Sequence, residues 1–115
     1  MEMEEIQMQK NEIDWANLGF GYIVTDQRFV ANYKDGAWDA GHLTADPKVT
    51  MNECAGVLQH AQTVLEGMKA YTTVNGQIVT FRPELNAKRM VDSATRLEMP
   101  ACPAARFLAA VTAPV

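Results

Sequence analysis

Residues 66–100 constrain the fold more than any other part of this 115-residue chain. Two runs rich in β-forming residues, MKAYTTV and QIVTF, flank Asn75-Gly76, the pair that favours a type I′ hairpin turn. Pro83 then fits the first turn of a helix, where its missing N–H costs little, and helix-forming residues continue to about Arg96. This segment therefore predicts a β-hairpin followed directly by a helix.

The residues before this segment predict further short elements. Residues 19–33 hold two β-forming runs around Asp26-Gln27, which predicts a hairpin, and Asp35-Gly36 predicts a tight turn soon after it. Residues 39–48 are expected to form a loop. Residues 52–65 predict a helix that ends at Gly67, because apolar residues recur at helical spacing. The members of that apolar stripe are Val57, Ala61, Val64 and Leu65.

After Pro103, the run ARFLAAVTA predicts a last helix. The expected fold class is therefore α+β, a small antiparallel sheet with flanking helices, over residues 13–115. Residues 1–12, MEMEEIQMQKNE, lack an apolar face and predict a mobile tail or a short frayed helix. Their acidic and polar character is unlike a signal peptide.

Composition excludes several classes of partner. The net charge is −4 and the pI about 5.0, which argues against a nucleic-acid footprint. No apolar run approaches the roughly 18 residues of a membrane span. Cys54 and Cys102 lie far apart, as expected for reduced thiols rather than a disulfide framework, so a cytoplasmic location is expected.

The predicted helix from Pro83 presents a basic face. Arg89, Ser93 and Arg96 recur at i, i+4 and i+7, and a guanidinium beside a hydroxyl can clamp an anion. Spacing alone favours a solvated face whose arginines pair with nearby carboxylates. The candidate partners are Glu84, Asp92 and Glu98.

Other polar residues indicate structure rather than chemistry. His60 has no partner at i±3 or i±4 that a general base would need. Together with His42, Glu53 and Cys54 it lacks the compact spacing of metal ligands, so no metal site is expected. Glu66 is expected to cap backbone N–H groups of the turn that follows it. Four aromatic residues are expected in the core or at its rim, namely Trp15, Phe20, Tyr22 and Trp38.

Four runs carry a family resemblance. IDWANLGFGYIVTD, YKDGAWDAG, EGMKAY and FRPELNAKRMVDSATRLEMP occur in this order over residues 13–100. Together they resemble the N-terminal small domain of branched-chain amino-acid aminotransferases, fold-type IV enzymes that depend on pyridoxal 5'-phosphate. The resemblance implies reversible transfer of an amino group between leucine, isoleucine or valine and 2-oxoglutarate, in a homodimer, with no nucleic-acid or membrane partner.

The resemblance also assigns roles to individual residues. It implies that Arg89, in the NAKRM run, binds the cofactor phosphate. It places Phe20 in the substrate side-chain pocket and Tyr22 at the edge of that pocket. His60 stands where the family has a tyrosine that faces the substrate, which implies a pocket of altered shape and hydrogen bonding.

The family's Schiff-base lysine and the glutamate at the pyridine nitrogen belong to a second, larger domain. The lysines of this sequence do not match the setting of that catalytic lysine, so no catalytic residue is expected in these 115 residues. Lys69, in EGMKAY, matches a family position that is not the Schiff-base residue; the others are Lys10, Lys34, Lys48 and Lys88. The chain alone is therefore expected to be inactive and not to retain the cofactor. The alternative is a non-catalytic interaction or oligomerisation module derived from that domain.

Overall fold

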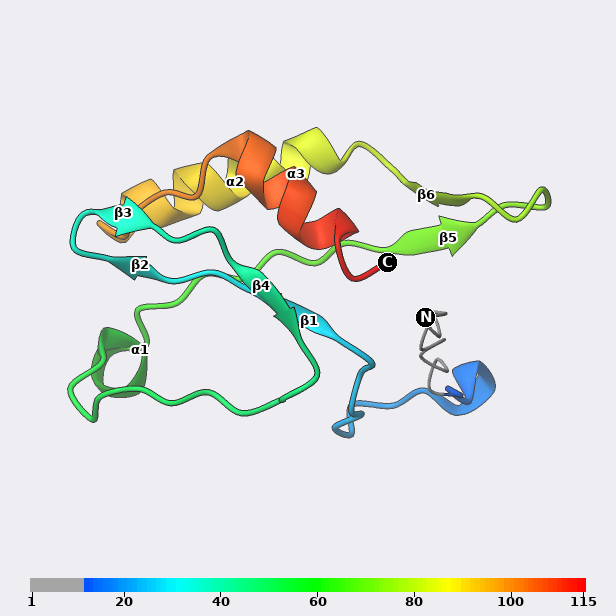
Figure 1. Ribbon diagram of the computed structural model, residues 1–115, viewed down its shortest axis with the longest axis horizontal. Helices are drawn as coiled ribbons and strands as arrows, with labels where there is room; N and C mark the ends of the chain where they lie inside the picture. The colour runs from blue at the N-terminus through cyan, green and yellow to red at the C-terminus, as the bar shows by residue number, and fades with distance from the viewer. Residues whose placement is uncertain (1–11) are drawn as a thin grey trace, which may run out of the picture.

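A computed structural model describes residues 12–115, so the predicted tail lies almost entirely outside the described residues. Within them the α+β class is confirmed, with the antiparallel pairing divided among three two-stranded ladders, as Figure 1 shows. The elements in chain order are η1 (Trp15–Asn17), β1 (Arg28–Val30), β2 (Tyr33–Lys34), β3 (Ala37–Trp38), β4 (His42–Thr44), α1 (Gly56–His60), β5 (Ala70–Thr72), β6 (Ile78–Thr80), α2 (Pro83–Arg96) and α3 (Ala104–Thr112).

The helices α2 and α3 lie side by side and pack against each other (Figure 1). α2 has the bounds that the sequence predicts, with Pro83 in its first turn, Glu84 near the positive end of the helix dipole and Arg96 near the negative end. Ala87 and Ala94 are buried on one stripe of α2, 0% and 3% exposed. Small side chains at these positions let a neighbouring helix approach closely. The predicted last helix is confirmed as α3.

The hairpin around Asn75-Gly76 is also confirmed, because β5 and β6 pair antiparallel with Tyr71 opposite Val79. The predicted type I′ turn is wrong, since Gly76 has φ 79° but Asn75 has no positive φ. The Gly76 N–H donates to Thr73 O at 2.9 Å, so the glycine takes the left-handed position at the end of a longer loop. Asn-Gly thus identified the hairpin but not its turn.

The hairpin predicted for residues 19–33 is wrong. β1 pairs with β4, inside the segment expected to be a loop, and no strand forms before β1 in the described residues. The tight turn at Asp35-Gly36, with φ 52° and 83°, is confirmed and joins β2 to β3. This turn folds the chain back on itself, which brings β4 opposite β1. Arg28 secures the pairing by donating to Asp46 O at 2.7 Å and Lys48 O at 2.6 Å.

The helix predicted for residues 52–65 is largely wrong. Only the five residues of α1 are helical, and Ala61 ends them with φ 50°. The apolar stripe that predicted a longer helix has little to pack against within the described chain, since Leu65 is 88% exposed. A short helix without tertiary packing is marginal in water, so the chain leaves the helix after one turn.

The described chain buries few large side chains. The core role predicted for Trp15, Phe20 and Tyr22 is wrong, because they are 74%, 112% and 78% exposed. Trp38 is half-buried and donates from Nε1 to Ala101 O at 3.2 Å. In the part that the structure describes, no helix is both long and apolar enough to cross a membrane.

The packing of α2 gives a stability prediction. Ala87→Leu should lower the free energy of unfolding by about 1–3 kcal/mol, because the added methyl groups have no room at a fully buried position. Lys88→Leu is the matched control, since Lys88 is exposed on the same helix and its change should be close to neutral. Urea unfolding followed by circular dichroism measures both, and equal losses would mean that Ala87 is not tightly packed.

Candidate anion site on helix α2

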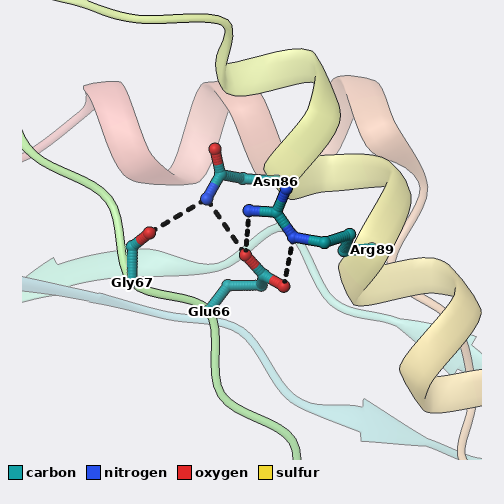
Figure 2. A network of polar contacts seen from close by, with 4 residues as sticks. All are labelled: Glu66, Gly67, Asn86 and Arg89. Carbon is teal, nitrogen blue, oxygen red and sulfur yellow. Dashed lines mark hydrogen bonds and ion pairs between the residues drawn. The ribbon is translucent and has the colours of Figure 1, made fainter.

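A bidentate ion pair joins α2 to the extended segment before β5, as Figure 2 shows. Arg89 donates from Nε to Glu66 Oε1 at 3.1 Å and from Nη2 to Glu66 Oε2 at 2.8 Å. Two parallel N–H···O bonds fix both the distance and the plane of the guanidinium. The pair therefore orients Arg89 as well as neutralising part of its charge.

Asn86 completes the network one turn earlier on α2. Its Nδ2 donates to Glu66 Oε2 and to Gly67 O, each at 3.0 Å (Figure 2). Asn86 is 8% exposed and the Glu66 side chain 12%, whereas the Arg89 side chain is 56% exposed. The carboxylate is therefore the shielded centre of the network, and Arg89 is its solvent-facing edge.

The network perturbs both ionisable groups. The hydrogen bonds from Arg89 chiefly hold the pKa of Glu66 below its usual value of 4.5; the hydrogen bond from Asn86 adds to this, and partial burial opposes it. In return, the hydrogen bonds to Glu66 raise the pKa of Arg89. Both partners are therefore charged near neutral pH.

Arg89 also lines a hollow of about 650 Å³ between α2 and the start of the β5–β6 hairpin. Lys69 and Arg82 line the same hollow, which brings three cationic side chains to one surface, while Glu66 is not part of its lining. Arg82 lies 3.5 Å from Glu84, and both side chains are more than half exposed, so Glu84 screens that charge only weakly. These three cationic side chains favour binding of an anion, and we call this space the basic hollow.

The structure places the other predicted site residues elsewhere. Phe20 and Tyr22 lie between η1 and β1, and His60 ends α1; all three are exposed. Figure 1 shows η1, α1 and α2 in three separate parts of the described chain. Of the predicted residues, only Arg89 therefore lies at the basic hollow. No cluster of possible metal ligands occurs within residues 12–115.

Glu66 is the residue that sequence reasoning missed. The predicted role as a backbone cap is wrong, because its carboxylate accepts from the side chains of Arg89 and Asn86. The carboxylates expected to pair with the basic face lie on α2 or just after it. The ion pair of Arg82 with Glu84 is likewise between residues close in sequence. Glu66 lies 23 positions before Arg89, at no helical spacing, so no local pattern signals the pair.

Comparison with known proteins confirms the resemblance carried by the motifs. The chain is 48% identical over 99 residues to the branched-chain-amino-acid aminotransferase of Haemophilus influenzae, and 45% identical over 98 residues to that of Helicobacter pylori. It is 36% identical over 101 residues to the branched-chain-amino-acid transaminase 1 of Bacillus subtilis. These matches cover 85–87% of this chain but only 28–29% of each relative. No family model matches.

The ion pair makes stability depend on pH. Glu66→Gln should lower the melting temperature at pH 7, because it removes the charged acceptor of Arg89. Since the folded-state pKa of Glu66 is below 4.5, the stabilisation is complete above about that pH and is lost as the pH falls through the lower, folded-state value. The difference between wild type and variant should therefore shrink toward pH 3.

Thermal unfolding followed by circular dichroism between pH 7 and pH 3 measures this difference. Glu53→Gln is the control, because Glu53 is exposed, lies outside the helices, and its carboxylate makes no hydrogen bond or ion pair among residues 12–115. A wild-type advantage over Glu66→Gln that stays constant down to pH 3 would contradict the linkage to the carboxylate.

Proposed function

We propose that this chain is the N-terminal part of a branched-chain amino-acid aminotransferase. The assembled enzyme would exchange an amino group between leucine, isoleucine or valine and 2-oxoglutarate through pyridoxal 5'-phosphate, in the cytoplasm and as a homodimer. The observation that carries this proposal is the similarity to aminotransferases over 86% of the chain. The basic hollow at Arg89 supports it independently.

The residues at the hollow fit a phosphate group. The guanidinium of Arg89 uses one edge for Glu66, and a second edge, formed by Nη1 and the other N–H of Nη2, has no hydrogen bond within residues 12–115. A planar fork of this kind suits two phosphate oxygens, and Lys69 and Arg82 add positive charge nearby. Arg89 would hold the phosphate there. When bound, the cofactor supplies the electron sink for the chemistry at the amino acid.

The substrate pocket would need residues from beyond this hollow. We propose that Phe20, Tyr22 and His60 contribute to it in the assembled enzyme. Their exposure leaves each of the three side chains free to contact another part of the assembled enzyme or a ligand, and Phe20, for example, is 112% exposed. The histidine would present a polar, titratable ring to the substrate.

The same exposed surface also favours a second candidate, a non-catalytic module that pairs with a partner or with itself. The two candidates differ in what the chain does inside an aminotransferase. The test is a chimera in which this chain replaces the matching segment of the Haemophilus influenzae enzyme, which is 48% identical to it. Transamination of leucine by a folded chimera supports the enzyme; a folded chimera without activity supports the module.

Within such a chimera, Arg89→Ala should weaken the affinity for pyridoxal 5'-phosphate about 10- to 100-fold. That range corresponds to the loss of charge-assisted hydrogen bonds to phosphate. Arg96→Ala is the matched control, because Arg96 is exposed in the last turn of α2 and does not line the hollow. Titration of the apoenzyme with cofactor, read by absorbance, measures both, and equal losses would contradict the assignment of Arg89.

The 115 residues alone should show no transaminase activity and no absorbance band of a protein-bound cofactor. The reason is that none of the five lysines in this sequence matches the setting of the family's Schiff-base lysine. A coupled assay with leucine and 2-oxoglutarate, together with a spectrum after addition of pyridoxal 5'-phosphate, tests this on the purified chain. Turnover or a shifted cofactor band would overturn the expectation.

A further inference from the structure

The guanidinium of Arg89 has two edges that can each make a bidentate contact. Glu66 occupies the edge formed by Nε and Nη2, with hydrogen bonds of 3.1 and 2.8 Å. The other edge, the fork of Nη1 and Nη2, makes no hydrogen bond within the described residues. Arg89 lines the basic hollow, whereas Glu66 lies outside its lining.

Glu66 is itself held in place. Its side chain is only 12% exposed, and Asn86 donates to Oε2 at 3.0 Å while also holding the neighbouring Gly67 carbonyl (Figure 2). Asn86 and Arg89 lie one turn apart on α2, so both donate hydrogen bonds to the carboxylate from the same helix face. A carboxylate fixed in this way can fix the side chain that binds it.

We propose that Glu66 is a positioning residue for the anion site, holding the guanidinium of Arg89 so that its free fork faces the phosphate of the cofactor. The inference rests on the proposed function and deepens it. A free arginine side chain must lose rotamer freedom when it binds an anion, and Glu66 removes much of that loss in advance. Asn86 supports Glu66 through the hydrogen bond already described.

A different role for Glu66 makes the opposite prediction. If the carboxylate only neutralised Arg89, its removal would strengthen anion binding, because a negative charge near the site would be gone. If Glu66 positions Arg89, its removal weakens anion binding despite the lost negative charge. The sign of the change therefore separates positioning from neutralisation.

The experiment uses the apo form of the chimeric aminotransferase, titrated with pyridoxal 5'-phosphate. Glu66→Gln should weaken the affinity about fivefold to tenfold, the range expected when an arginine must order its own side chain on binding. Asp92→Asn is the matched control, since it removes one negative charge from the exposed surface of α2, where Asp92 has no partner among residues 12–115, and should leave the affinity unchanged. Unchanged or tighter binding by Glu66→Gln would overturn the proposal.

Two further variants separate this inference from the proposed function. The double variant Glu66→Gln with Arg89→Ala should bind no more weakly than Arg89→Ala alone, because Glu66 acts through Arg89. If Arg89→Ala binds like wild type, the phosphate assignment of the proposed function fails. If Arg89→Ala loses affinity and Glu66→Gln does not, only the positioning role fails.

A second measurement needs no cofactor. In the 115-residue chain, the Nε–H resonance of Arg89 should be resolved and slow to exchange with solvent, because that proton is bonded to Glu66. Glu66→Gln should speed its exchange, and Asp92→Asn should not. An Nε–H that exchanges rapidly in the wild-type chain would contradict a fixed guanidinium even if the chimera failed to fold.

Discussion

The charge-assisted network of Glu66, Asn86 and Arg89 is the interaction on which the organisation of the candidate anion site depends. It links the extended segment before β5 to α2 across 23 positions of sequence. Without it, the basic side chains of α2 would be a solvated helix face of no particular geometry. With it, one guanidinium has a defined plane, and its second edge makes no hydrogen bond among residues 12–115.

The network matters more because apolar burial is small in the described chain. Ala87 and Ala94 are the buried apolar side chains of residues 12–115, and both belong to α2. A core of two alanine side chains removes little apolar surface from water. Polar contacts between segments that are distant in sequence therefore contribute a larger share of the tertiary structure's stability. Two further contacts of this kind are the hydrogen bond from Trp38 to Ala101 O and the one from Arg28 to Asp46 O.

Local chemistry predicted the elements whose own residues determine them. Pro83 and the helix formers after it specify α2, and Asp35-Gly36 specifies a turn with two positive φ angles. The wrong predictions concern segments whose structure is determined by tertiary contacts. The apolar stripe of residues 52–65 predicted a helix that would need a packing surface. The run before β1 was expected to pair with β1, but β1 pairs with β4 instead. Neither outcome could be predicted from the local sequence alone.

The site shows the same division between local and distant determinants. Arg89 could be singled out from the sequence, because it lies on a helix face and within a family motif. Its partner could not, because a carboxylate 23 residues away has no fixed spacing to a helix that it meets only through the fold. The sequence therefore identifies the residue that carries the positive charge. It does not show how the side chain of that residue is oriented. In the structure the guanidinium is held by Glu66 through a bidentate contact, although the sequence around Glu66 indicates nothing more than a turn.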